Sequence, residues 1–188
     1  ERRGSAPVEA HAAVLIVRNP FDAIDSFWNM VLTSSHNHSV QEREYARLSG
    51  EWERLVEREA AVWAAFHRHW VSVASTTPLL AIRYEDLIHP ERRQEMLQVA
   101  VAFLCKRAQA ADGVSSAAAE AALRGMLGRI DRAAGMVERR GGSKRAGVYH
   151  PRRGQEGAAL HHFSQSLREE VVRAAGAEMC LFRYQNVT

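Results

Sequence analysis

The most constraining feature of the sequence is the stretch VLIVRNPFDAIDSF, residues 14–27, in which an apolar run stops abruptly at Arg-Asn-Pro. The run over 12–17 is too short for a helix and does not alternate with polar residues, which predicts a strand buried on both faces, as in a parallel sheet. Asn19 and Pro20 then supply a helix N-cap and a first-turn proline, and Asp22 stands at the capping-box position. A strand, an arginine and a helix N-terminus are therefore expected in immediate succession.

A second short apolar run, LLAIRY over 79–84, predicts another buried strand, while the remaining segments carry apolar residues at helical spacing. Helices are expected from Pro20, over 41–77 (one helix, or two joined near Gly50), over 90–106, from 115 or 116 to about 134, and from Ser164 or from Ser166, which has capping-box spacing to Glu169. This pattern indicates a helix-rich α/β fold with a parallel sheet flanked by helices. Two strands make a poor sheet, so we expect the missing strands before Glu1 and interpret 1–188 as a single, N-terminally truncated domain.

The composition is that of a globular protein, with 46% hydrophobic and 25% charged residues. No apolar run is long enough to predict a membrane span. Cys105 and Cys180 lie in apolar helical surroundings, which favours buried free thiols over a disulfide. The net charge is +3, and six basic residues fall within 139–153 without any acidic residue. This distribution indicates an anionic ligand.

Arg18 and Ser26 are the candidate phosphate ligands of the opening stretch. Arg18 is the first residue past the predicted strand, and Ser26 lies seven residues beyond Asn19, nearly on the same helix face. Because ligands of open α/β sheets bind at the carboxyl ends of strands, the guanidinium and the hydroxyl can converge there on one phosphate, assisted by the helix dipole. The alternative is that Arg18 caps a sheet edge and Ser26 bonds a helix carbonyl.

Three segments, in order along the chain, resemble the sulfotransferases that use 3′-phosphoadenosine-5′-phosphosulfate (PAPS). RNPFDAIDS resembles the family's 3′-phosphate motif, which implies that Arg18 and Ser26 bind that phosphate. IRYEDLIHP resembles the strand whose tyrosine lies beside the adenine, a role that falls to Tyr84. RRGQEGAALHHFS resembles the Arg-Lys-Gly segment that folds over the 3′-phosphate, which implicates Arg152, Arg153 and Gly154.

The resemblance implies a P-loop NTPase-like sulfotransferase fold and transfer of a sulfuryl group from PAPS to an acceptor hydroxyl. The style of the motifs is nearer to the branch that contains WSC-domain sulfotransferases, which implies a carbohydrate acceptor and favours the Golgi lumen, with the cytoplasm as the alternative. A membrane anchor is then expected only outside these residues. The resemblance implies no metal and no nucleic-acid partner.

The sequence departs from the family in the two features that act on the sulfuryl group, the 5′-phosphosulfate loop and the catalytic base. It shows no Gly-, Ser-, Thr- and Lys-rich loop for the 5′-phosphosulfate, since GGSK at 141–144 comes late and follows no strand. The catalytic base is unknown, because His11 lies at the start of the first strand, the wrong end for the site. We therefore expect these 188 residues to bind the 3′-phosphate and adenine side of PAPS without turning it over.

The histidines do not predict a metal site. The pair His36 and His38 lacks carboxylate or cysteine partners nearby, and His67 and His69 face different directions on a helix. His161 and His162 are interpreted as rim residues near the basic loop.

Two other function classes remain open. One is a nucleotide or phosphate kinase, which would need a Gly-Lys phosphate loop that is not visible. The other is a non-catalytic helical interaction module that docks a partner through Trp52, Trp63 and Trp70 and touches acidic surfaces with its basic loop.

Overall fold

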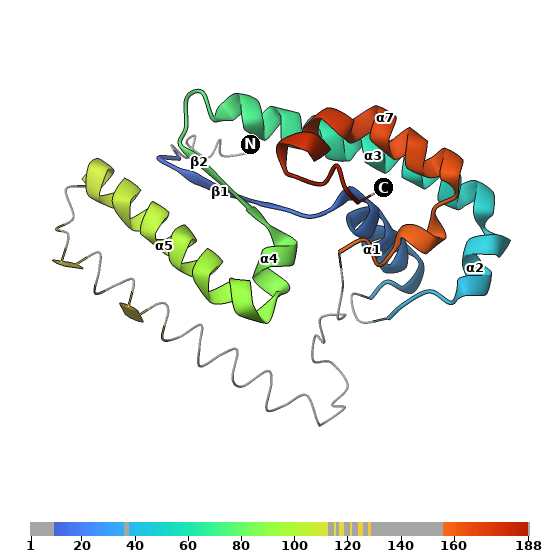
Figure 1. Cartoon of the computed structure of the whole chain (residues 1–188), viewed down its shortest axis with the longest axis horizontal. Coiled ribbons are helices and arrows are strands. Elements are labelled where there is room, and N and C mark those ends of the chain that lie inside the picture. Colours follow the sequence, from blue (N-terminus) through green and yellow to red (C-terminus); the bar gives the residue numbers. More distant parts are fainter. Residues whose placement is uncertain are drawn as a thin grey trace, which may run out of the picture.

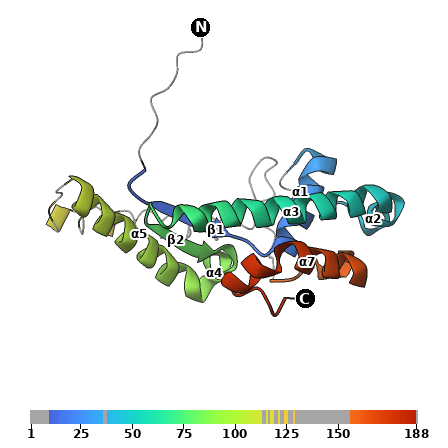
Figure 2. The ribbon, with the colours of Figure 1, turned by 90° about the horizontal axis from the view of Figure 1, so that it is seen from above.

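The computed structural model describes residues 10–35, 38–112 and 156–187, with scattered positions between 115 and 128. Within these residues, β1 (Ala13–Val17) and β2 (Leu79–Arg83) form a two-stranded parallel sheet in which Val17 pairs with Arg83. Helix α3 (Ser49–Val73) lies on one side of the sheet and α5 (Pro90–Asp112) on the other (Figures 1 and 2). The prediction of a helix-rich α/β arrangement with a small parallel sheet flanked by helices is confirmed.

The sheet is less buried than the sequence predicted. Leu15 and Val17 lie in the core, but Ile16, on the opposite face of β1, is 55% exposed. Helix α5 packs mainly against α4 (Tyr84–Ile88) and β2, so it does not cover Ile16. The expectation that this strand is buried on both faces is therefore wrong.

Helix α1 (Pro20–Thr33) begins as predicted, with Asn19 as its N-cap. The Asn19 side chain accepts a hydrogen bond of 2.9 Å from the amide of Phe21. The predicted capping box does not form, because the Asn19 amide donates to Glu85 and the Asp22 carboxylate accepts from Gly157 and Ala159 instead. Backbone amides that are distant in sequence thus replace the local partner of Asp22.

The long amphipathic segment is two helices, α2 (Glu42–Arg47) and α3, as in the second of the two predicted alternatives, and the break lies at Leu48, near Gly50. Trp52 and Trp63 are buried in the hydrophobic core, and Trp70 packs against it. A partner could not reach the first two rings, so the proposed tryptophan docking stripe is wrong for them.

The chain enters helix α4 directly from β2, and Tyr84 is the first helical residue rather than the last strand residue. Helix α5 runs to Asp112, six residues beyond its predicted end. The described positions 117, 118, 121, 124, 125 and 128 are helical, where the sequence predicted an alanine-rich helix.

The described chain resumes at 156 and passes through a short 3₁₀ turn, η1 (Leu160–His162), into α7 (Gln165–Leu181), which packs along α3 (Figure 1). Ser164 is the N-cap of α7, and its hydroxyl accepts from the Leu167 amide at 3.3 Å. The alternative start at Ser166 is wrong, and Glu169 accepts from Gln165 rather than closing a capping box.

Cys105 and Cys180 form no disulfide with each other, as predicted. Cys105 is half-buried but Cys180 is exposed, so the predicted burial fails for Cys180, which lies on the outer side of α7. Among the described helices, none combines the length and apolar character that a membrane crossing requires.

Candidate functional site

The carboxyl ends of the two parallel strands form the centre of the candidate site. Because Val17 and Arg83 are paired, the residues that follow them, Arg18 and Tyr84, emerge side by side. The guanidinium carbon of Arg18 lies 5.0 Å from the centre of the Tyr84 ring, a cation–π distance. The structure thus brings together two residues that are 66 positions apart in the sequence and that were both predicted to contact the nucleotide.

Glu85 connects this edge to the first turn of α1. Its Oε1 accepts a 2.9 Å hydrogen bond from the Asn19 amide, and its Oε2 lies 2.6 Å from the Tyr184 hydroxyl. The same hydroxyl is 3.0 Å from the carbonyl oxygen of Val17, the last residue of β1. Burial, followed by the hydrogen bond to Glu85, raises the pKa of Tyr184, so the hydroxyl keeps its proton and acts as a donor. Hydrogen bonds to the Glu85 carboxylate therefore connect the ends of the two strands.

The N-terminus of α1 is not open for an anion in the way the sequence suggested. The Asn19 amide is bound to Glu85, the Phe21 amide to the Asn19 side chain, and Pro20 has no amide hydrogen. The Asp22 carboxylate adds negative charge in the same turn. The prediction that the N-terminus of α1 assists phosphate binding is therefore wrong for these amides. A phosphate bound at this place would be held by side chains.

Ser26 is half-buried on α1, about 10 Å along the helix axis from Asn19. The described contacts of Ser26 include no hydrogen bond to Arg18 or Tyr84, so its convergence with Arg18 on one phosphate stays a prediction. Arg152, Arg153 and Gly154 lie outside the described residues, and their predicted contact with the 3′-phosphate stays a prediction as well.

The chain directly after them is anchored to the first turn of α1. The two oxygens of Asp22 accept hydrogen bonds from the amides of Gly157, at 2.8 Å, and Ala159, at 3.0 Å. Burial raises the pKa of Asp22, while these two bonds and the charge of Arg18 act in the opposite direction. A side chain that was predicted only to cap a helix therefore fixes the start of the last segment beside the strand ends.

Arg83 is a strand-end cation that the sequence analysis missed, because it was counted as part of an apolar strand. Its guanidinium lies 4.5 Å from the centre of the Tyr184 ring and pairs with Glu156. The Nε atom of Arg83 is buried and has no hydrogen-bond partner among the described residues. A hollow of about 280 Å³ lies next to it, with Arg83, Asp86, Met96 and Arg183 in its wall.

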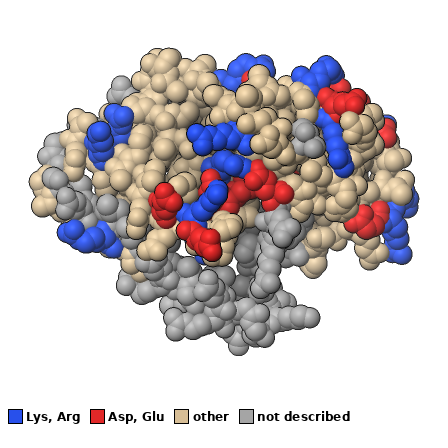
Figure 3. Space-filling view, viewed as in Figure 1, with Lys and Arg blue, Asp and Glu red and all other residues tan. Residues whose placement is uncertain are grey.

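The charges around the site are mixed. Figure 3 shows basic and acidic side chains intermingled at the centre of this face of the molecule, rather than a purely basic surface. A larger hollow of about 480 Å³ lies on α7, lined by Gln165, Arg168 and Glu169 among others. Of the predicted nucleotide residues that the structure describes, Arg18, Ser26 and Tyr84, none lines it, so we assign the site by the strand ends and not by the size of a cavity.

The histidines are placed differently from their prediction in one respect. His67 is buried and His69 is exposed on α3, so the two side chains face different directions, as predicted. His162, however, is not a rim residue. Its side chain is only 12% exposed and its ring stacks on Tyr45 with the ring centres 3.8 Å apart.

Comparisons of the chain with protein-family models, with curated proteins and with solved structures found no match. The function is accordingly inferred from the residues and geometry of this chain.

Proposed function

We propose that this chain forms the 3′-phosphate and adenine side of the donor site of a PAPS-dependent sulfotransferase with a P-loop-like fold. In the complete reaction, an acceptor oxygen forms a bond to sulfur while the bond from sulfur to the 5′-phosphate oxygen breaks. The acceptor proton passes to a base, and adenosine 3′,5′-bisphosphate leaves. We assign no base among the described residues, and a carbohydrate hydroxyl in the Golgi lumen is the proposed acceptor.

The juxtaposition of Arg18 and Tyr84 at the carboxyl ends of the parallel strands is the observation that carries this proposal. An arginine supplies the planar, permanently charged donors that suit a phosphate. A tyrosine beside it offers a flat apolar surface for a purine. The two residues come from separate segments, each of which resembles the sulfotransferase motif independently, and they meet at the sheet edge where ligands of α/β folds bind.

The anchoring of Gly157 and Ala159 on Asp22 supports the assignment of the basic segment. Asp22 lies in the same turn as the N-cap that follows Arg18, and Gly157 comes three residues after Gly154. The described chain that follows Arg152, Arg153 and Gly154 is thus tied to the first turn of α1, which comes directly after Arg18 and Asn19.

Isothermal titration with adenosine 3′,5′-bisphosphate tests the proposal. Arg18→Ala removes a charge-assisted hydrogen bond and should weaken binding by about 1.5–3 kcal/mol, and Ser26→Ala should weaken it by about 1 kcal/mol. Arg173→Ala is the matched control, because Arg173 is an exposed arginine on α7 that pairs with Glu170; its binding should equal that of the unsubstituted chain. A folded Arg18→Ala variant with unchanged affinity would show that Arg18 is only architectural.

A further inference from the structure

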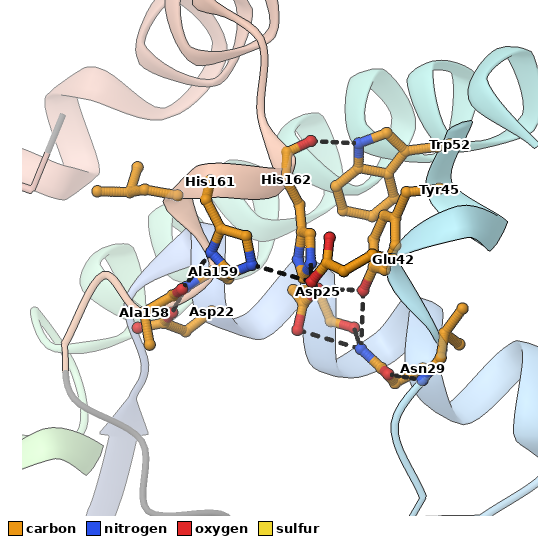
Figure 4. Close-up of polar contacts among 12 residues, drawn as sticks. Asp22, Asp25, Asn29, Glu42, Tyr45, Trp52, Ala158, Ala159, His161 and His162 are labelled. Atoms are coloured by element: carbon orange, nitrogen blue, oxygen red, sulfur yellow. Dashed lines mark hydrogen bonds and ion pairs between the residues drawn. The ribbon is translucent and has the colours of Figure 1, made fainter.

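A cluster of two histidines and three acidic or phenolic side chains lies at the junction of α1, α2 and η1, apart from the strand ends. Figure 4 shows Glu42 of α2 and the adjacent His161 and His162 of η1 turned toward one another. Behind His162 lie Asp25 of α1 and Tyr45 of α2. Glu42 is more than a hundred positions from the histidines in sequence, so only the fold brings these groups together.

The three facing donor atoms have the separations of metal ligands. The Nε2 atom of His162 lies 3.1 Å from Oε1 of Glu42, and the Nε2 atom of His161 lies 3.3 Å from the same oxygen. One ligand atom from each of the three residues lies within 4.8 Å of the other two. Zinc–ligand bonds of about 2.0–2.1 Å in a tetrahedral arrangement place two ligand atoms about 3.3 Å apart. The present arrangement therefore needs only small adjustments to surround an ion.

The other ring nitrogens are held by hydrogen-bond acceptors. The Nδ1 atom of His161 lies 2.8 Å from the carbonyl oxygen of Ala158, and the Nδ1 atom of His162 lies 2.8 Å from Oδ1 of Asp25. Since a carbonyl and a carboxylate only accept, each Nδ1 carries the hydrogen, and in the neutral ring Nε2 then has the lone pair. This is the tautomer that a metal-binding histidine needs, and an outer carboxylate or carbonyl is its usual support.

Asp25 is itself fixed in place. Its Oδ1 accepts a 2.5 Å hydrogen bond from the Tyr45 hydroxyl, and its Oδ2 accepts one of 3.1 Å from Asn29. The Tyr45 ring stacks on His162, and Trp52 donates to the His162 carbonyl oxygen at 3.0 Å. The inner histidine is thus held on one face of its ring, at its Nδ1 atom and at its backbone carbonyl, which is the preorganisation that a binding site requires.

We propose that Glu42, His161 and His162 bind a zinc ion through one carboxylate oxygen and two Nε2 atoms. Two imidazoles and one carboxylate form a donor set suited to zinc. The side chains of Glu42 and His161 are 75% and 60% exposed, so the ion has a path from solvent and a water molecule completes its fourth position. The bound ion ties α2 to η1, and Asp25 serves as the positioning residue for His162.

Titration of the 188-residue chain with Co²⁺, followed by its visible absorption, and with Zn²⁺, followed by calorimetry, tests the site. We expect one ion per chain and the strong visible band of tetrahedral cobalt. His161→Gln and Glu42→Gln each remove one ligand from an exposed position and should weaken Zn²⁺ binding by more than the roughly 10–100-fold that loss of an outer-sphere partner costs. Asp25→Asn, an outer-sphere change, should fall within that range and keep the cobalt band.

His69→Gln and Glu51→Gln are the matched controls, since both residues are exposed on α3 and outside the cluster; each should bind Zn²⁺ like the unsubstituted chain. Circular dichroism without metal checks that each variant is folded, and either ligand variant alone is sufficient for the test. A Zn²⁺ affinity that is the same in His161→Gln and Glu42→Gln as in the controls would overturn the proposal. So would the absence of a tetrahedral cobalt band, which would leave an ordinary ion pair between Glu42 and the histidines.

Discussion

Glu85 is bound by two donors from distant segments. Its Oε1 accepts a hydrogen bond from the Asn19 amide, and its Oε2 accepts one of 2.6 Å from the hydroxyl of the fully buried Tyr184. Tyr184→Phe removes that hydroxyl and leaves Oε2 of Glu85 without this donor. We expect the free energy of unfolding to fall by about 1–3 kcal/mol, measured by urea denaturation, because a partly buried acceptor loses its partner.

Ser75→Ala is the control for that measurement. The Ser75 hydroxyl is exposed and donates a hydrogen bond to the nearby carbonyl oxygen of Ser72. Its loss should change the free energy of unfolding by less than about 0.5 kcal/mol. Equal effects of the two substitutions would mean that the Tyr184–Glu85 contact contributes nothing measurable.

The buried His67 on α3 should make the stability of the chain depend on pH. Burial lowers its pKa, although the hydrogen bond to the Trp63 carbonyl and the charge of Glu178 act in the opposite direction. The folded chain therefore holds His67 neutral at pH values where the unfolded chain already takes up the proton. The contribution of neutral His67 to the free energy of unfolding is complete above the unfolded pKa of about 6.5. It is lost as the pH falls below that value toward the lower pKa of the folded chain.

Urea denaturation between pH 5 and pH 8 measures this contribution. The pH dependence should be weaker in His67→Gln, whose amide can still donate to the Trp63 carbonyl, while the exposed His69→Gln should follow the unsubstituted chain. A His67→Gln variant that loses stability on acidification as steeply as the unsubstituted chain would contradict the assignment.

At the scale of elements, the turn that leads into η1 depends on one glycine. Gly157 has φ of 76°, in the left-handed region, and a Cβ there would lie 3.2 Å from side-chain atoms of Leu160 and Val187. Gly157→Ala should therefore destabilise the protein by about 1–2 kcal/mol. Gly176, in the middle of α7, has room for a Cβ, so Gly176→Ala should stabilise it by about 0.5–1 kcal/mol. Thermal denaturation of both variants checks the pair, and a shift in the same direction for both would contradict the account.

The anchoring of the same turn on α1 is a separate prediction. Asp22→Ala removes the acceptor of two hydrogen bonds from backbone amides, one buried and one partly buried, and should cost about 1.5–3 kcal/mol, whereas Asp22→Asn keeps one oxygen and should cost less. Hydrogen exchange at the amides of Gly157 and Ala159 is the specific readout. Protection that survives Asp22→Ala at both amides would show that another group holds this segment.

The elements that the sequence predicted well are those set by local chemistry. The apolar runs before Arg18 and before Tyr84 form the two strands, and Asn19 and Ser164 cap their helices. The errors come from long-range partners. Glu85 and the amides of 157 and 159 displaced the predicted capping box, because contacts between distant segments compete with local ones and do not leave a periodic pattern.

At the scale of the whole molecule, the two candidate sites differ in how well they could be predicted from the sequence. Arg18, Ser26 and Tyr84 stand in segments with recognisable motifs, and two of them meet at the strand ends. The cluster of Glu42, His161 and His162 has no such signature, because one ligand comes from a helix in the first third of the chain and two from a turn near its end. Only the packing of α1, α2 and η1 places them together.

The most direct test of the central claim, that the strand ends bind the 3′-phosphate of an adenine nucleotide, is the melting temperature of the chain with adenosine 3′,5′-bisphosphate and with ADP. A ligand that binds only the folded state at about 100 times its Kd stabilises it by about 2.7 kcal/mol. The account predicts a clear rise in melting temperature with the 3′,5′-bisphosphate and a much smaller one with ADP at the same concentration. Equal shifts with the two nucleotides, or none with either, would contradict it.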